Sequence, residues 1–255
     1  MAMRKRTKQI LAGAGIFAGL VLLCGGWFIY KFNSETSRMR PVNTGPVTSD
    51  VIAVKDEFVN MYLVKNGAHY VAVDAGKDLK IVAEELQKIR VNPDMVDAVF
   101  LTHTDMDHVA ALPLFKNAKL YFAREELKML NGKKQKIPFY NNHISRDNYT
   151  LLDDGQTINT GEIRISCILT AGHTSGSMCY QINDKYLFTG DILSLHDGKL
   201  GKSVKFFDLD HEMTTQSISR IINLAGVQYL LTSHWGISDD YTNAVKGWKE
   251  QAGAP

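Results

Sequence analysis

The sequence predicts an α/β fold in which helices cover both faces of a two-sheet sandwich. Short apolar runs typical of strands recur through both halves of the chain, and each half also carries helical segments. With 255 residues, of which 45% are hydrophobic, the chain can bury one large core. We therefore expect one globular domain with an N-terminal appendage.

In the first half of the domain, apolar runs bounded by polar residues predict five strands. Asp78 can cap a helix over Leu79–Arg90, and Pro93 lies just beyond the end of that helix. Two further helices are expected over His108–Phe115 and Arg124–Leu130. The predicted strands are Val51–Val54, Val59–Lys65, Ala68–Val73, Val96–Leu101 and Leu120–Phe122.

The second half of the domain repeats this pattern after a polar, irregular segment from Gly132 to Asn148. That segment is either a substrate-recognition loop or a disordered surface excursion. Helices are expected over Thr214–Leu224 and Asp239–Glu250. The predicted strands are Thr150–Leu152, Ile163–Leu169, Met178–Ile182, Lys185–Phe188 and Tyr229–Leu231.

Two imidazoles and two carboxylates lie within one six-residue segment, His103-Thr104-Asp105-Met106-Asp107-His108, which directly follows an apolar run. Without a cation, Asp105 and Asp107 would repel each other and raise each other's pKa. A divalent metal ion removes this conflict, because carboxylate and imidazole are its usual ligands. The alternative interpretation is a solvated acidic loop with two incidental histidines.

Three further polar segments each follow an apolar run and carry one strong metal ligand: His173, Asp191 and His234. Glycines in these segments let the backbone turn tightly and approach an ion, while Ser and Thr hydroxyl groups can orient the ligands. Four such loops in one chain indicate a metal site rather than incidental histidines.

The four loops resemble the metal motifs of the metallo-β-lactamase superfamily, whose members include glyoxalase II, ribonuclease Z and lactonases. That family has a His-x-His-x-Asp-His motif, then a His in a Gly-His-Thr context, an Asp after Gly, and a late His. The stretch from Asn60 to Gly76 also resembles the opening hairpin of the family. The resemblance covers residues 51 to 250 and implies a four-layer αββα metallo-β-lactamase sandwich over residues 51–252.

The resemblance also implies a site for two divalent metal ions. One ion would be held by His103, Asp105 and His173, and the other by Asp107, His108 and His234, with Asp191 bridging both. A metal-bound hydroxide would attack an ester, thioester, lactone or phosphodiester, and the ions would stabilise the developing oxyanion. Asp107 is the expected catalytic side chain, because it can also orient the attacking water.

One position departs from the family motif, because its second His is Asp105 here. Two divalent ions, three ligand carboxylates and one hydroxide sum to a formal charge of zero, whereas His would leave one positive charge. A less positive centre is a weaker Lewis acid, and an oxygen ligand shifts the metal preference from zinc toward manganese or iron. We expect two ions, with zinc favoured and manganese or iron as alternatives.

Three functional classes fit this residue set. The first is a metallo-hydrolase, and the second is an iron-dependent oxidoreductase or dioxygenase of the same fold. The third is a non-catalytic metal-binding sensor, which the complete set of seven ligands disfavours. Among hydrolases, Asp105 and the glyoxalase-like loop around His173 favour activities other than β-lactam hydrolysis.

An uncharged apolar segment from Ile10 to Tyr30 is long enough to cross a bilayer as a helix. The basic residues within 1–8 favour an N-terminus on the cytoplasmic side. We expect a single-pass transmembrane anchor over residues 9–30, a linker over residues 31–50 and a catalytic domain outside the cytoplasm. The alternatives are a cleaved signal peptide and lipidation at Cys24.

A net charge of +2 disfavours nucleic acid as a partner. The expected partners are a small-molecule substrate and the membrane, which the N-terminal helix would enter. An anionic substrate could meet Lys202 or Lys205 on the loop that follows Asp191.

A few remaining residues have more than one interpretation. His143, His196 and His211 are loop histidines that either face the site or are simply solvated. Cys167 and Cys179 are expected in the core, and a disulfide between them is the alternative.

Overall fold

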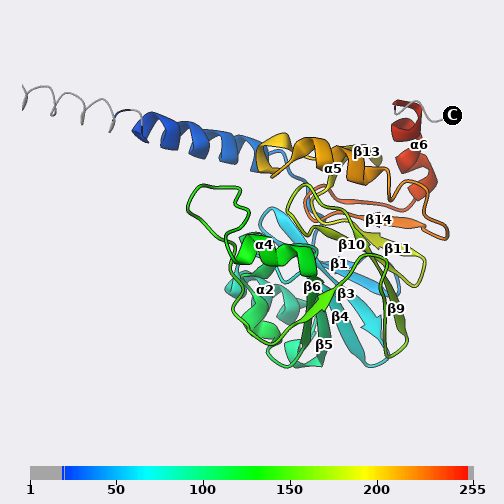
Figure 1. Ribbon diagram of the computed structural model, residues 1–255. Coiled ribbons are helices and arrows are strands. Elements are labelled where there is room, and N and C mark those ends of the chain that lie inside the picture. The colour runs from blue at the N-terminus through cyan, green and yellow to red at the C-terminus, as the bar shows by residue number, and fades with distance from the viewer. Residues whose placement is uncertain (1–18, 20, 252–255) are drawn as a thin grey trace, which may run out of the picture. The chain divides into compact units, whose positions relative to one another are not determined.

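The computed structural model describes residue 19 and residues 21–251, and the chain divides into two units, Met1–Met39 and Arg40–Pro255. In the first unit, residues 21–36 form a helix (blue in Figure 1). Among the described residues, no helix is both long enough and apolar enough to span a membrane. The basic stretch 1–8 and much of the expected anchor over residues 9–30 lie outside the described residues.

The first sheet of the second unit contains seven strands in the order β1-β2-β3-β4-β5-β6-β7. Neighbours from β1 to β4 are antiparallel, whereas those from β4 to β7 are parallel. β1 lies within the residues expected to form a linker and pairs with β2. The strands are β1 (Gly45–Pro46), β2 (Val51–Asp56), β3 (Val59–Asn66), β4 (His69–Val73), β5 (Val96–Phe100), β6 (Lys119–Ala123) and β7 (Thr150–Leu152).

The second sheet contains six strands in the order β15-β14-β11-β10-β9-β8, with β11 and β14 parallel. Its strands are β8 (Thr157–Thr160), β9 (Ile163–Leu169), β10 (Met178–Ile182), β11 (Tyr186–Phe188), β14 (Tyr229–Leu231) and β15 (Ile237–Ser238). A separate hairpin joins β12 (Leu193–His196) to β13 (Lys199–Lys202). The sequence did not predict β8, β12, β13 or β15, because these strands are short and most contain polar residues.

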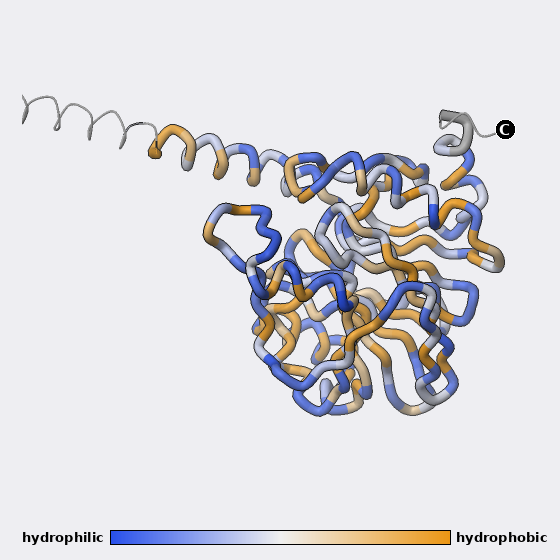
Figure 2. The backbone as a smooth tube through the Cα atoms, in the orientation of Figure 1, coloured by the Kyte–Doolittle hydropathy of each residue, from blue (hydrophilic) through white to orange (hydrophobic). Residues whose placement is uncertain are grey.

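A core of apolar side chains lies between the two sheets. Val64 and Phe100 of the first sheet pack there with Ile165 and Phe188 of the second. Figure 2 shows apolar residues concentrated along the strands and polar residues in the turns that join them. Burial of these inner faces against each other stabilises the sandwich, at roughly 25 cal/mol per Å² of apolar surface.

Helices cover the outer face of each sheet, and together the four layers form the expected αββα sandwich (Figure 1). Leu86 of α2 (Leu79–Lys88) packs with Leu63 on the first sheet. Val245 of α6 (Tyr241–Gln251) and Ile218 of α5 (His211–Ile218) pack with Leu230 on the second sheet. The short 3-10 helices η1 (Pro93–Met95) and η4 (Lys205–Phe207) lie in connecting segments.

Several predicted helices are shorter than the sequence suggested. The cap of α2 is confirmed, because the Asp78 side chain accepts hydrogen bonds from two backbone N–H groups of the first turn. His108–Phe115 is divided into α3 (Met106–Val109) and η2 (Leu112–Phe115), since Pro113 has no N–H to continue the helix. The third expected helix is divided into η3 (Arg124–Glu126) and α4 (Leu127–Leu130).

Cys167 and Cys179 are both buried and free. Cys167 packs in the core between the sheets, whereas Cys179 packs in the outer core of the second sheet. The expectation that both are core residues is confirmed. The alternative of a disulfide is wrong, because the two side chains lie on opposite faces of the sheet.

Candidate metal centre

Each of the four polar loops begins at the carboxyl end of a strand. β5 leads to His103, β9 to His173, β11 to Asp191 and β14 to His234. The structure brings all seven expected ligands together in three overlapping groups. Within each group, the ligand atoms lie within 4.8 Å of one another. The groups are His103, Asp105 and His173; His103, His108 and Asp191; and Asp107, His108 and His234.

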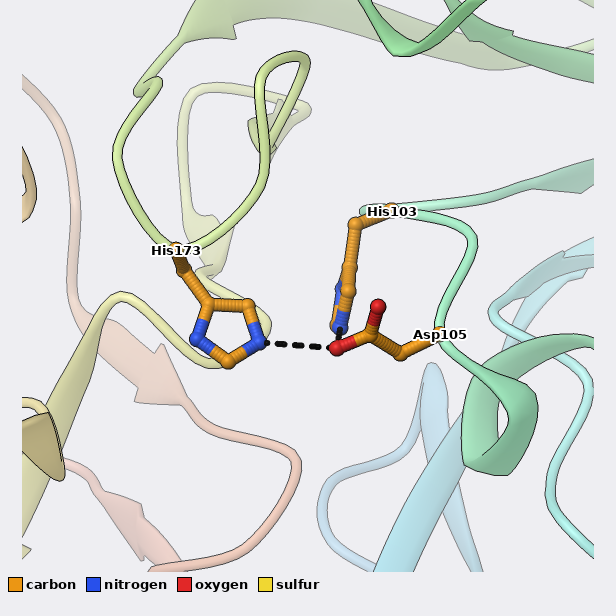
Figure 3. Close-up of side chains that lie close together, drawn as sticks. All are labelled: His103, Asp105 and His173. Atoms are coloured by element: carbon orange, nitrogen blue, oxygen red, sulfur yellow. Dashed lines mark ion pairs between the residues drawn. The ribbon is translucent and has the colours of Figure 1, made fainter. Parts of the chain in front are cut away.

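We call His103, Asp105 and His173 the first half-site (Figure 3). Asp105 Oδ2 is 3.5 Å from His103 Nε2 and 3.3 Å from His173 Nε2. Asp191 Oδ2 lies 3.8 Å and 3.5 Å from the same two nitrogens. Tetrahedral ligand bonds of about 2.0–2.2 Å would separate donors by about 3.3–3.6 Å. The spacing therefore suits a metal ion.

We call Asp107, His108 and His234 the second half-site. Asp107 Oδ2 is 3.4 Å from His234 Nε2 and 3.7 Å from His108 Nε2. Asp191 contacts this group as well, with Oδ1 3.5 Å from His108 Nε2 and Oδ2 2.9 Å from His234 Nε2. Asp191 thus reaches both half-sites, as a bridging carboxylate would.

Unpaired buried atoms at the centre support a cation site. Among the described residues, the buried side-chain atoms without a hydrogen-bond partner include His103 Nε2, His108 Nε2 and Asp191 Oδ1. Each buried polar atom that lacks a hydrogen bond or a bound ion lowers the stability of the fold by about 1–3 kcal/mol. Imidazole and carboxylate donors converging in this way fit divalent ions.

Asp74 orients two of the histidine ligands. Its Oδ2 accepts a hydrogen bond from His108 Nδ1 at 2.9 Å, and its Oδ1 accepts one from the Thr102 backbone N–H at 2.7 Å. The Thr102 hydroxyl also lies 3.0 Å from His103 Nδ1. In the neutral imidazole of His108, Nδ1 donates to Asp74, so that Nε2 carries the lone pair that a metal ion needs.

Asp208 supports His173 in the same way. Its Oδ1 accepts a hydrogen bond from His173 Nδ1 at 3.0 Å, and its Oδ2 accepts bonds from Ser203 Oγ and His211 Nδ1, both at 2.6 Å. His211 therefore contacts the support of a ligand rather than the centre itself. His234 Nδ1 donates to a backbone carbonyl, Phe58 O, at 2.7 Å.

Glu126 joins the loops on which the first half-site is built. This fully buried carboxylate accepts hydrogen bonds from Thr104 N and Thr104 Oγ1, both at 2.8 Å. Its other oxygen accepts bonds from Thr174 Oγ1 at 2.7 Å and Gly176 N at 2.8 Å. The loops of Asp105 and His173 are thereby held at a fixed separation.

The segment Gly132–Asn148 reaches the first half-site through two side chains. The Lys136 ammonium donates to Asp105 Oδ2 and, at 2.8 Å, to His173 Nε2. Asn142 Nδ2 donates to the other Asp105 oxygen at 2.8 Å. This segment therefore borders the centre, as a substrate-recognition loop would.

The pKa shifts show that this centre concentrates negative charge. Burial lowers the pKa values of the His108, His173 and His234 imidazoles, but the neighbouring carboxylates outweigh it, so that all three pKa values are raised, that of His173 to about 9. His103 and the two carboxylates Asp105 and Asp191 shift the other way. Burial lowers the pKa of the His103 imidazole, and the neighbouring His108 ring lowers it further. Burial alone would raise the pKa of the Asp191 carboxyl, but the His234 and His108 rings hold it well below its usual range. Burial would also raise the pKa of the Asp105 carboxyl, but the positive charge of Lys136 outweighs this effect. The pKa of Asp105 is therefore well below its usual range.

Other residues considered from the sequence lie away from this centre. His143, Lys202 and Lys205 are exposed, and no contact joins them to the seven ligands in the described part of the chain. His196 contacts the Trp235 ring and Ser194 instead. The sequence analysis did not identify Asp208, Glu126, Lys136 or Asn142, since no local motif marks them.

The sandwich and its centre of converging histidines and carboxylates define the class of metallo-β-lactamase-fold proteins. A family model with the description "Metallo-beta-lactamase superfamily" matches residues 54–234. The chain belongs to this superfamily.

Curated relatives match parts of the chain. A "Probable polyketide biosynthesis zinc-dependent hydrolase" of Bacillus subtilis is 36% identical over 124 residues, which are 48% of this chain and 48% of that protein. A hydroxyacylglutathione hydrolase of an Enterobacter species is 28% identical over 168 residues, 64% of this chain and 56% of that protein. The chain thus spans about half the length of the curated relatives it matches.

Solved structures share the fold. A mutant metallo-β-lactamase from Cronobacter sakazakii has a TM-score of 0.60 and 16% identity, covering 76% of this chain and 81% of that chain. A B3 metallo-β-lactamase with an active-site glutamic acid has a TM-score of 0.64 and 14% identity, covering 88% and 91%. At such identities the likeness concerns the fold alone.

Proposed function

We propose that the protein is a dinuclear metal-dependent hydrolase of a small ester, thioester, lactone or phosphodiester. The observation that carries this proposal is the set of unpaired buried atoms, His103 Nε2, His108 Nε2 and Asp191 Oδ1, at the centre of seven converging ligands. Two divalent ions bound there would supply an ionised water and stabilise negative charge on the reacting oxygen.

The protein's own side chains would orient the reaction. Asp74 and Asp208 direct the Nε2 atoms of His108 and His173 toward the centre. The histidine side chains are at most 3% exposed, whereas that of Asp107 is 20% exposed. A substrate and its water would therefore approach from the carboxylate side, where Asp107 can accept a hydrogen bond from the water.

The relatives support a hydrolytic reaction. One is named as a zinc-dependent hydrolase and another as a hydroxyacylglutathione hydrolase. Zinc is accordingly the first metal to test. Asp105 supplies an oxygen where the family motif has an imidazole, so the first half-site would bind manganese or iron more readily than a three-histidine site.

The test is a hydrolysis panel with the zinc-loaded full-length protein and its Asp107→Asn variant. The panel contains a 4-nitrophenyl ester, an acyl thioester, a lactone and bis(4-nitrophenyl) phosphate. We expect turnover of at least one compound, and a fall in kcat/KM of about hundredfold or more in Asp107→Asn. Asp147→Asn is the control, because Asp147 is an exposed carboxylate. No turnover by a metal-loaded wild type, or full activity in Asp107→Asn, would contradict the proposal.

Metal preference is tested with Asp105→His. Competition between zinc and manganese for the wild-type protein and this variant should show a shift toward zinc when the imidazole replaces the carboxylate. Unchanged selectivity would show that Asp105 does not set the metal preference.

We also propose that residues 9–30 anchor the protein in a membrane, with the hydrolase domain outside the cytoplasm. The support is the uncharged apolar sequence from Ile10 to Tyr30 and the basic residues that precede it. In cell fractionation, the full chain should stay with membranes after alkaline carbonate washing. Release by the wash would contradict an anchor that spans the bilayer.

A further inference from the structure

The positively charged side chain of Lys136 lies in the first half-site. The Lys136 ammonium donates to Asp105 Oδ2 and to His173 Nε2, which are ligand atoms for the same metal ion. The side chains of the three ligands of the second half-site, Asp107, His108 and His234, contact one another, the Asp74 and Asp191 carboxylates and the Phe58 carbonyl oxygen. The two half-sites therefore differ in charge although Asp191 reaches both.

The contact between Lys136 and His173 uses the lone pair that a metal ion would use. The Lys136 ammonium has no lone pair and can only donate, so His173 Nε2 is the acceptor in this contact. The ring proton then lies on Nδ1, which donates to the Asp208 carboxylate. A metal ion in the first half-site needs the same nitrogen and the same Asp105 oxygen. The ammonium must therefore leave before the ion can bind there.

The surrounding segment allows this side chain to leave without unfolding. Asn142 holds the far limb of the segment through hydrogen bonds to Asp105 and Thr104, and Ile144 is buried in the outer core of the first sheet. Neither anchor depends on Lys136. The Lys136 side chain is 16% exposed and has a flexible four-carbon stem, so it can rotate into solvent.

We propose that Lys136 is an internal competitor for the metal ion of the first half-site. The protein then loads its second half-site first and its first half-site only at higher metal concentration. Asp105 gives the physical reason, because a carboxylate attracts the ammonium whereas an imidazole at this position would not. The inference rests on the proposed function in one respect, since it takes the seven side chains as metal ligands.

The experiment is a zinc titration of the full-length protein against a chromophoric chelator. Wild type should bind two ions whose affinities differ by about tenfold or more, and in Lys136→Met the weaker ion should bind about tenfold more tightly. Lys136→Gln should behave in the same way, which guards against a folding defect in one variant. Lys134→Met is the control, because Lys134 is an exposed lysine of the same segment, and it should retain the wild-type affinities.

The outcomes separate this inference from the proposed function. Two ions bound with the same affinities in wild type, Lys136→Met and Lys136→Gln would overturn the role of Lys136 and leave the dinuclear hydrolase standing. If neither the wild type nor any variant binds zinc, both the role of Lys136 and the dinuclear hydrolase are overturned.

Discussion

Replacing Glu126 by Gln tests whether one buried carboxylate holds the first half-site together. Glu126 accepts four hydrogen bonds, from the N–H and hydroxyl of Thr104, the hydroxyl of Thr174 and the N–H of Gly176. In Gln, an NH₂ group replaces one oxygen and faces one backbone N–H and one threonine hydroxyl, whichever way the amide is turned. The hydroxyl can rotate and accept from the NH₂ group, but the backbone N–H loses its acceptor. With one buried hydrogen bond lost, the free energy of unfolding should fall by about 1–3 kcal/mol. Typical domains have only about 5–15 kcal/mol in total.

The assay is thermal unfolding of wild type, Glu126→Gln and Glu125→Gln. Glu125 is the matched control, because its carboxylate pairs with Lys128 at the protein surface. We expect the Tm of Glu126→Gln to fall by about 2 °C or more and that of Glu125→Gln to stay within about 1 °C of wild type. The reasoning is refuted if Glu126→Gln unfolds at the wild-type temperature.

Three further predictions follow from the contacts of the centre. Asp74→Ala removes the acceptor that orients His108, so zinc affinity measured by chelator competition should fall about 10–100-fold, while the surface variant Asp97→Ala should bind as wild type does. Gly172→Ala would place a Cβ 2.2 Å from Thr214 N, at a residue whose φ is 137°, so we expect insoluble protein or a sharply lower Tm. The control is Gly247→Ala, which should remain soluble because no atom lies within 4 Å of the new Cβ. Removing zinc with a chelator should lower the free energy of unfolding by about 2.7 kcal/mol for each ion that had been present at about a hundredfold over its Kd, and an unchanged Tm would contradict this.

The seven candidate ligands could be predicted from the sequence because each follows an apolar strand within a short polar loop. The structure brings all seven together, including His234, which is far from His103 in the chain. The residues that support them could not be predicted, because their contacts depend on tertiary packing. Glu126 is 22 residues from Thr104 and 48 from Thr174, and no local pattern links these positions.

The same distinction applies to the fold. Strands with long apolar runs, such as β3 (Val59–Asn66) and β9 (Ile163–Leu169), were predicted to within a residue. β12 and β13 were not, because a hairpin over Leu193–Lys202 is specified by pairing between its strands rather than by a continuous apolar run. The break between α3 and η2 follows from Pro113, whose missing N–H outweighs the helical apolar pattern of the segment.

We propose above all that the two half-sites, joined by Asp191, hold two metal ions. The most direct test of this proposal is elemental analysis of the full-length protein after equilibrium dialysis against saturating zinc, beside the Asp191→Ala variant. We predict about two zinc ions per wild-type chain and about one or fewer in Asp191→Ala. A folded wild-type chain that retains no zinc above the dialysis buffer, or two ions retained without Asp191, would contradict it.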